Sequence, residues 1–273
     1  MKCNFLKSLF KKQDIFENYF TIKVNKNRKD FLLPLEKINN RNELFLHGLN
    51  DYEKQINDNL QQFINGYTFN NLLITGAIGS GKTSLIKKSA KKYENQNLKL
   101  IIFSKKDMVL LEDVIYKLKC KNSKYKFLIL LDDISFESSD DIYQSTKSLL
   151  EGTYDSIENF MICATSNRRH MTKELFENNS TDSDSDEIHP SDLTSDLLSL
   201  YDRFGIHIHL YQNSQIIYLE LVKKILSNIS DYKFNPQIER MALNWAIKRA
   251  SRSGRTAKQF VYDYVGKKKL KSI

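Results

Sequence analysis

One stretch of this chain has the residue types and spacing of a phosphate-binding site. A short apolar strand, Asn70 to Thr75, leads into the pattern Gly-x4-Gly-Lys-Thr, and a helical pattern follows it. Three of the nine glycines in the chain fall between Gly76 and Gly81, where the backbone must turn sharply and aim successive N–H groups at an anion. The predicted nucleotide-binding residues are Gly76, Ala77, Ile78, Gly79, Ser80, Gly81, Lys82, Thr83 and Ser84.

Two side chains at the end of this loop have the chemistry that nucleotide phosphates require. Lys82 would reach the β- and γ-phosphates, and the hydroxyl of Thr83 would ligate Mg²⁺. An ordinary glycine turn is the structural alternative, but even the bare pattern, without its strand and helix context, arises by chance in only roughly one such chain in 200. The loop therefore predicts ATP and Mg²⁺ as ligands.

Two adjacent carboxylates follow the apolar strand at 126–131. Asp132 stands where a carboxylate must lie to hold the magnesium, usually through a water molecule. Asp133 would face the γ-phosphate and could polarise the attacking water. The alternative for both is a helix N-cap or a surface charge. Thr83 and Asp132 are thus the candidate metal ligands, and Asp133 is a candidate catalytic residue.

Three further polar residues are candidates for catalysis. Asn167 follows a buried strand and could orient a water molecule. Arg203 precedes the last strand and could act as an arginine finger in the site of the next subunit, whereas Arg255 begins a helix and could reach the γ-phosphate of its own subunit. A planar, permanently charged guanidinium suits both tasks better than lysine does. The alternative for each arginine is a structural ion pair with an aspartate.

Strands and helices alternate along the chain in an order that positions these residues. That rhythm predicts an α/β fold with a doubly wound parallel sheet of the P-loop NTPase type, covered by helices on both faces. Ligands of such sheets bind beyond the carboxyl ends of the strands, where the phosphate loop, Asp132 and Asn167 lie. Strands are expected at 70–75, 98–103, 126–131, 159–164 and 205–210, and helices at 50–64, 85–93, 111–118 and about 140–151.

The chain divides into three predicted parts. Residues 1–45 form a poorly defined N-terminal segment, in which Met1 to Lys12 favours a short amphipathic helix docked on its own domain over a membrane-surface anchor. Residues 46–211 form the nucleotide-binding core, interrupted at about 178–196 by an acidic stretch that predicts a mobile surface loop. Residues 212–273 form a small basic lid made only of helices.

The charge of the chain is concentrated in the predicted lid. The 273 residues carry a net charge of +9, and Gln212 to Ile273 hold 13 lysines and arginines against 4 acidic residues. Such a segment is either a solvated basic surface or one that faces the phosphates of a nucleotide or nucleic acid. Apolar runs are too short for a membrane span, and the start lacks a secretory signal. Three cysteines without metal spacing favour a reducing cytoplasm.

Taken in order, the phosphate loop, Asp132-Asp133, Asn167, Arg203 and Arg255 resemble the motif set of an AAA+ ATPase. More narrowly, the chain is similar to a bacterial AAA+ family of unassigned cellular role over about residues 44–266. The segments that carry this narrower resemblance are Gly48-Leu49-Asn50, Asp132 to Glu137, Ala164 to His170, Glu187 to Pro190, Asp202 to Gly205 and Ser251 to Arg255.

The resemblance implies roles that the residues alone do not fix. It makes Asp132 the Walker B carboxylate, Asn167 sensor 1, Arg203 the finger acting in trans and Arg255 sensor 2. It also implies a homo-oligomer, commonly a ring, with nucleotide at the subunit interfaces. One departure is that Asp133 stands where a catalytic glutamate is usual, which predicts slow turnover and leaves Glu137 as an alternative base.

Three functions remain as hypotheses at this point. The first is a cytoplasmic Mg-ATPase that uses hydrolysis to change the angle between core and lid and so remodels an unidentified partner. The second is an ATP-gated loader or remodeller of nucleic acid, whose basic C-terminal domain docks on phosphate backbones. The third, a small-molecule kinase, explains the phosphate loop but gives Asn167 and Arg255 no task.

Overall fold

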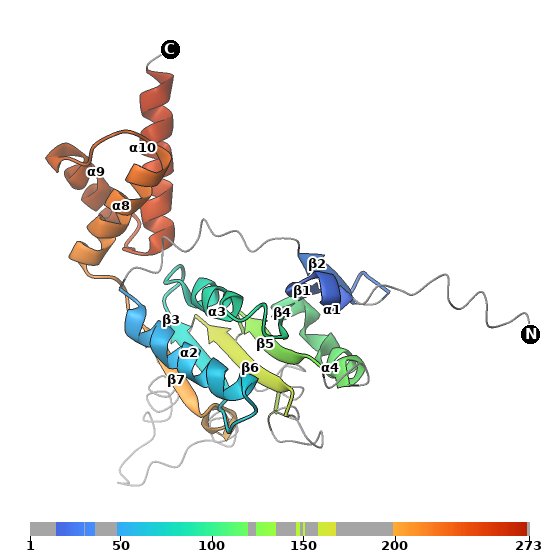
Figure 1. The fold of residues 1–273 in the computed structure, drawn as a ribbon. Helices are drawn as coiled ribbons and strands as arrows, with labels where there is room; N and C mark the ends of the chain where they lie inside the picture. The colour runs from blue at the N-terminus through green and yellow to red at the C-terminus, as the bar shows by residue number, and fades with distance from the viewer. Residues whose placement is uncertain are drawn as a thin grey trace, which may run out of the picture.

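The computed structural model describes residues 15–29, 31–35, 48–119, 124–134, 146–147, 150, 158–167 and 199–271 (Figure 1). Several expectations concern residues outside these ranges. They are the amphipathic helix at Met1 to Lys12, most of the helix at 140–151, the alternative base Glu137 and the acidic loop at 178–196.

A seven-stranded sheet forms the centre of the core, in the order β2-β1-β4-β5-β6-β3-β7. Every neighbouring pair is parallel except β1 and β2, which pair antiparallel at one edge. The predicted fold class, a mostly parallel sheet with a helical C-terminal lid, is confirmed. The strands are β1 (Thr21–Val24), β2 (Leu32–Leu35), β3 (Leu72–Gly76), β4 (Leu98–Ser104), β5 (Lys126–Asp132), β6 (Phe160–Ser166) and β7 (Ile206–Leu210).

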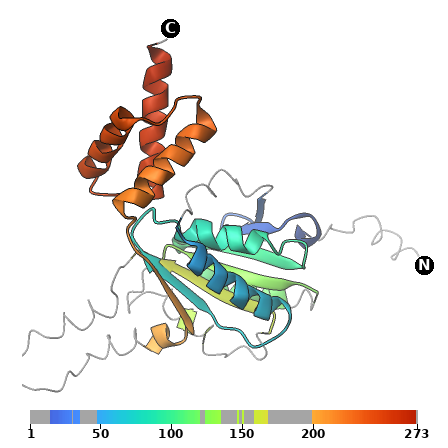
Figure 2. The ribbon, with the colours of Figure 1, turned by 60° about the vertical axis from the view of Figure 1, so that its left-hand side comes forward.

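Helices cover both faces of this sheet because successive side chains of each strand point to opposite sides. On one face, Leu100 and Leu130 pack with Leu60 and Leu85 from the two helices α2 and α3. Figures 1 and 2 show α2 and α3 lying side by side over the sheet. The core helices are α1 (Ile15–Asn18), α2 (Asn50–Ile64), α3 (Lys82–Lys91) and α4 (Leu111–Lys119), with a 3-10 turn at Lys105–Leu110.

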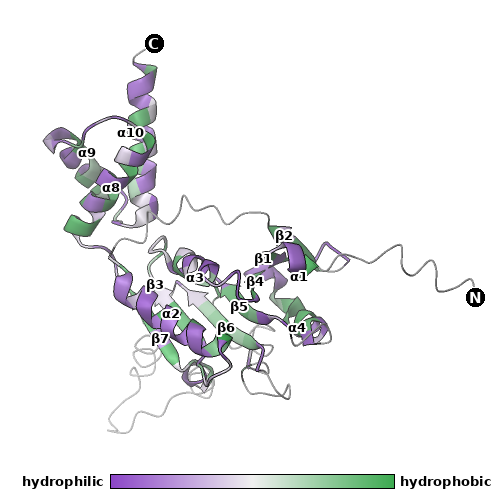
Figure 3. Ribbon diagram, in the orientation of Figure 1, coloured by the Kyte–Doolittle hydropathy of each residue, from purple (hydrophilic) through white to green (hydrophobic). Residues whose placement is uncertain are grey.

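The opposite face of the sheet is covered by α1 and α4. Its buried cluster contains Phe103 and Phe127 from the strands, Phe16 from α1 and Val114 from α4. The two aromatic rings of Phe16 and Phe127 meet edge to face with their centroids 5.4 Å apart. Colouring by hydropathy shows apolar to intermediate strands beside the mostly hydrophilic α2 (Figure 3).

The N-terminal segment contributes two strands that sequence reasoning did not identify. β1 pairs with β4, and β2 pairs with β1, so both extend the edge of the core sheet. Each strand has only four residues, too short for a clear alternating pattern. The apolar runs at Tyr19 to Ile22 and Phe31 to Leu33 mark their positions. The division of the chain at residue 45 remains a proposal.

Three helices form the lid: α8 (Gln215–Ile229), α9 (Pro236–Lys248) and α10 (Gly254–Leu270). Each begins at a residue whose side-chain oxygen accepts a hydrogen bond from a backbone N–H in the first turn, namely Ser214, Asn235 and Ser253. A separate apolar cluster holds them together, with Tyr218, Ala242 and other residues fully buried. In Figure 2 the lid stands beyond one end of the sheet. No helix in the described parts of the chain combines the length and the apolar character needed to cross a membrane.

Candidate nucleotide-binding site

The predicted phosphate loop connects the end of β3 to the start of α3. Gly76, Gly79 and Gly81 have φ angles of 141°, 78° and 103°, which L-residues with side chains rarely adopt. At Gly76 an added Cβ would lie 2.3 Å from the carbonyl oxygen of Leu210 on the neighbouring strand. The three glycines therefore allow the backbone to turn into α3, whose N-terminus favours an anion.

Lys82 is buried at the base of the loop, with 6% of its surface exposed. Its Nζ donates to the carbonyl oxygens of Gly76 at 2.7 Å and Ala77 at 3.0 Å, and to Oδ1 of Asn167 at 2.8 Å. Burial lowers the pKa of Lys82 from 10.5 to about 8, although the charges of Asp133 and Asp132 oppose the shift. A phosphate bound beside the ammonium would raise the pKa of Lys82 again.

Thr83 and Asp132 lie side by side, although 49 residues separate them in the sequence. The hydroxyl of Thr83 donates to Oδ1 of Asp132 at 2.5 Å. The same carboxylate oxygen accepts a hydrogen bond from the hydroxyl of buried Thr165 at 3.0 Å. Adjacent strands explain this arrangement, because β5 and β6 are parallel neighbours and bring Asp132 and Thr165 to the same edge. Two oxygen ligands suited to Mg²⁺ therefore meet at this edge.

Asp133 and Asn167 form a second polar pair beside the first. The Nδ2 of Asn167 donates to Oδ1 of Asp133, so Asn167 connects this carboxylate to Lys82. Asp133 has a φ of 59° and its N–H donates to the hydroxyl of Thr165 at 2.9 Å. Aspartate tolerates this left-handed conformation better than most residues. The turn directs the exposed carboxylate of Asp133 into the cleft.

The lid closes the cleft from the other side. The cleft has a volume of about 440 Å³, and Arg255 and Lys258 from α10 line it together with residues of the loop and the strand ends. The loop approaches the start of α10 closely at Gly79, where an added Cβ would lie 2.9 Å from Oγ of Ser253 and 3.1 Å from Cβ of Arg255. The loop and the lid are in direct contact.

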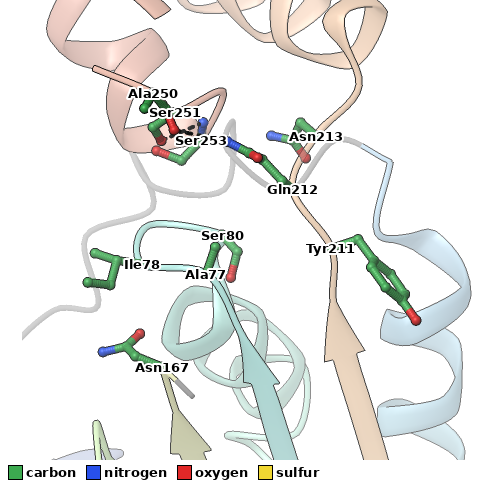
Figure 4. Close-up of a pocket in the computed structure, with 10 residues that line it drawn as sticks. All are labelled: Ala77, Ile78, Ser80, Asn167, Tyr211, Gln212, Asn213, Ala250, Ser251 and Ser253. Atoms are coloured by element: carbon green, nitrogen blue, oxygen red, sulfur yellow. Dashed lines mark hydrogen bonds between the residues drawn. The ribbon is translucent and has the colours of Figure 1, made fainter. Parts of the chain in front are cut away.

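A smaller pocket of about 250 Å³ adjoins the cleft at the junction of core and lid. Figure 4 shows Ser80 of the phosphate loop on the side of the connection between β7 and α8, whereas Ile78 lies on the opposite side of the loop. The amide of Asn213 on this connection donates to the carbonyl oxygen of Arg252 at 3.0 Å. The remaining lining residues are Asn167, Tyr211, Gln212, Asn213, Ala250, Ser251 and Ser253.

The structure brings most of the candidate residues together at one cleft, whereas Ala77 and Ser80 line the adjoining smaller pocket. Lys82, Thr83, Asp132, Asp133, Asn167 and Arg255 share the cleft with Ile78, Gly79, Gly81 and Ser84. Arg203 is not among the described residues that line it. It precedes β7, whose first residue pairs with the first residue of β3, so Arg203 lies at the opposite end of the sheet from the loop. There Arg203 donates to the carbonyl oxygen of Ser199 at 2.7 Å.

Sequence reasoning missed two residues of the cleft. Thr165 lies two residues before Asn167 and binds both Asp132 and the backbone of Asp133, but a threonine inside an apolar strand looks like an ordinary strand residue. Lys258 lies three residues after Arg255, on the same side of a helix, and this spacing was the available signal. The neighbouring arginines Arg168 and Arg169 lie outside the described residues.

A family model matches residues 17–268, nearly the whole chain. Its description is "Protein of unknown function (DUF815)". The chain belongs to the DUF815 family. No curated protein matches the sequence of this DUF815 chain.

Solved structures of AAA+ ATPases share the fold of the DUF815 chain. Domain III of the replication initiation protein DnaA from Thermotoga maritima is 15% identical, with a TM-score of 0.56, and the match covers 88% of this chain and 92% of that domain. The ORC1 protein of Aeropyrum pernix in complex with DNA is 11% identical, with a TM-score of 0.60 and coverage of 84% and 64%. The ORC2 protein of the same organism, solved with ADPNP and ADP, is 12% identical, with a TM-score of 0.52 and coverage of 80% and 68%.

At these identities the likeness establishes the AAA+ fold alone. The DUF815 chain spans less than two thirds of ORC1 and about two thirds of ORC2. The predicted resemblance to AAA+ proteins is thereby confirmed at the level of the fold, and the matching family model describes a family of unknown function, as the narrower resemblance implied. The roles of individual residues remain proposals.

Proposed function

We propose that this chain is a Mg²⁺-dependent ATPase that couples ATP binding and hydrolysis to movement of its lid, and so remodels a protein partner whose identity is open. One observation carries the proposal: residues from the phosphate loop, two strand ends and the lid converge on one cleft of about 440 Å³. A cytoplasmic location is part of the proposal and rests on the cysteine pattern alone.

The residues present fit a magnesium ion. The hydroxyl of Thr83 and the carboxylate of Asp132 are hard oxygen ligands 2.5 Å apart. Mg²⁺ commonly takes one or two such protein ligands and fills its other positions with phosphate oxygens and water. When bound, the ion supplies charge neutralisation on the β- and γ-phosphates. Thr165 holds the Asp132 carboxylate in the orientation that this requires.

The remaining polar residues are suited to bind phosphate and to position water. Lys82 lies at the loop with three hydrogen bonds that a phosphate oxygen can replace. Asp133 is placed to accept a proton from an attacking water, and Asn167 fixes its orientation. Arg255 reaches the cleft from α10, so a γ-phosphate would attract the lid and its release would free the lid.

Arg203 fits the proposal only if subunits assemble. Its place at the far end of the sheet excludes contact with the cleft of its own subunit. An arginine finger acts across a subunit boundary, where it stabilises transition-state charge in the site of the neighbouring subunit. We therefore include a homo-oligomer, commonly a ring, in the proposal.

The test of the ATPase proposal compares two lysine variants. Lys82→Ala should weaken MgATP binding on the order of 100-fold and abolish phosphate release, because it removes the buried cation of the loop. Lys54→Ala, on the exposed side of α2, should leave both unchanged. Calorimetric titration measures binding, and phosphate release is followed without any acceptor molecule. Binding without release in the unmodified chain would favour the kinase hypothesis instead.

A second candidate function is supported by the basic lid. The last 62 residues carry the whole net charge of +9, and ORC1 shares the fold and was solved in complex with DNA. An ATP-gated nucleic-acid loader requires affinity for DNA or RNA that falls steeply with salt. Absence of binding to duplex and single-stranded oligonucleotides at about 50 mM salt would reject it.

A further inference from the structure

The lid has a second concavity, on α9 and α10 and separate from the residues that line the nucleotide cleft. It has a volume of about 410 Å³. We call it the α9–α10 groove, and it is lined by Met241, Asn244, Trp245, Lys248, Phe260, Asp263, Tyr264, Lys267, Lys268 and Lys271.

The lining residues recur at helical spacing on both helices. On α9 they lie three or four residues apart from Met241 to Lys248, and on α10 from Phe260 to Lys271. Each set therefore forms one stripe along its helix. The α10 stripe alone extends about 16 Å at 1.5 Å per residue. A groove of this form, between two packed helices, accommodates the apolar side of another helix.

Charge on the groove is almost entirely positive. Lys248, Lys267, Lys268 and Lys271 are exposed and line it. Its acidic residue, Asp263, accepts a hydrogen bond from Lys267 at 2.8 Å and is neutralised by it. Between these charges lies apolar surface, including Met241, which is 45% exposed. The occupant that complements this surface has an apolar stripe flanked by carboxylates.

The aromatic rings of the groove are poorly placed to stack on nucleic-acid bases. The guanidinium of Arg249 covers the Trp245 ring, 3.5 Å from its centroid. Phe260 is 2% exposed, and its ring stacks on Tyr264 and meets Trp245 edge to face. Base stacking requires an open ring face. The basic N-terminal run Met1 to Lys12 of this chain is likewise disfavoured, because it carries the same sign of charge.

We propose that the α9–α10 groove binds an acidic amphipathic helix of a partner protein. The apolar side of that helix packs on Met241, Trp245 and Tyr264, and its carboxylates pair with the lysines of the groove. This inference is independent of ATP hydrolysis. Only the consequence that lid movement would carry the bound partner helix rests on the proposed function.

Trp245 provides a direct test, because it is the only tryptophan of the chain and lies in the groove. The probes are two tryptophan-free 18-residue peptides, one with leucine and one with phenylalanine at helical spacing, and glutamate elsewhere. Each has a control of the same composition in scrambled order, and a 15-residue oligothymidylate is a further probe. We expect at least one helical peptide to change the Trp245 emission saturably, with an affinity at least about tenfold above its scrambled control.

Two charge-reversal variants locate the contact. Lys268→Glu with Lys271→Glu should weaken peptide binding at least about tenfold, because both lysines border the groove. The matched control, Lys223→Glu with Lys224→Glu on the exposed side of α8, changes the net charge equally and should bind the peptide as the parent does. Binding of MgATP to each variant checks that the domain is folded.

Several results would overturn the inference. One is that neither helical peptide gives a saturable change in Trp245 emission. Another is that the scrambled peptides bind as tightly as the helical ones. A third is that the α8 control variant loses as much peptide affinity as the groove variant. The groove would be assigned to nucleic acid instead if the oligothymidylate bound saturably and competed for the groove more strongly than added peptide at the same concentration does.

Discussion

Lys82 is the residue whose chemistry depends most on its surroundings. A solvated lysine is charged at any physiological pH, but this one is buried and its pKa falls to about 8. The nearby carboxylates of Asp132 and Asp133 partly restore the charged form, and Arg255 opposes it. The charge state of the loop is therefore sensitive to what enters the cleft.

This sensitivity predicts proton uptake on nucleotide binding. A phosphate favours charged Lys82 and raises its pKa, so binding at pH 8 should take up about half a proton. Affinity should be constant below about pH 7 and fall by up to tenfold per unit as the pH rises above 8. Calorimetric titration in buffers of different ionisation enthalpy measures the uptake. Lys82→Arg should abolish it, because a guanidinium stays charged. An uptake that persists in Lys82→Arg would assign the proton to another group.

Elements rather than single residues determine the shape of the cleft. β3 joins the phosphate loop to the sheet, and its last residue, Gly76, pairs with Leu210 on β7. The helices α2 and α3 are tied together by Glu53, whose carboxylate bonds Lys88 at 2.7 Å and Lys92 at 2.5 Å. Burial raises the pKa of Glu53, but the two lysines outweigh it and lower the pKa overall. The phosphate loop thus lies between β3, which is paired with β7, and α3, which is joined to α2 by ion pairs.

Two glycine substitutions separate the effect of strand contact from that of backbone strain. Gly76→Ala should lower the free energy of unfolding by more than about 2 kcal/mol, because the added Cβ meets the Leu210 carbonyl at 2.3 Å. Gly66→Ala, at φ 74° and with no atom within 4 Å of the added Cβ, carries only the milder strain of the left-handed region and should cost about 1 kcal/mol. Urea unfolding measures both. Equal costs would show that the β3–β7 contact does not limit this position.

At the scale of the whole molecule, the site as it stands in one chain lacks the proposed finger. Arg203 and the phosphate loop lie at opposite ends of the β3–β7 pair.

Mixing two inactive variants tests assembly directly. Asp132→Asn should remove hydrolysis through the metal site, and Arg203→Ala should retain nucleotide binding but lose hydrolysis. In a random equal mixture, a site is complete where an Arg203→Ala subunit supplies Asp132 and an adjacent Asp132→Asn subunit supplies Arg203. About a quarter of the sites should therefore regain activity. Phosphate release measures the recovery, with mass measurement to verify mixed oligomers. An Arg203→Ala variant that hydrolyses ATP at the parental rate would remove the finger from the proposal.

The sequence by itself determined the order of strands and helices and the chemistry of the cleft. Glycine spacing, apolar runs and helical periodicity are local properties, so they predicted β3 to β7, the lid helices and residues such as Lys82 and Asp132. The strands β1 and β2 were not predicted, because a strand of four residues is too short to show a clear alternation of apolar and polar residues. Their place at the sheet edge depends on pairing with β4, which lies 79 residues further along the chain at the Ile22–Ile101 partners.

Only the tertiary structure decided which distant side chains meet. Thr165 gained its role because parallel pairing of β5 and β6 places its hydroxyl against Asp132. The α9–α10 groove exists because two helices pack side by side, which combines stripes that are unremarkable on each helix alone. The physical reason is the same in both cases. Local patterns fix what each segment prefers to be, whereas contacts between segments depend on how the buried faces fit together.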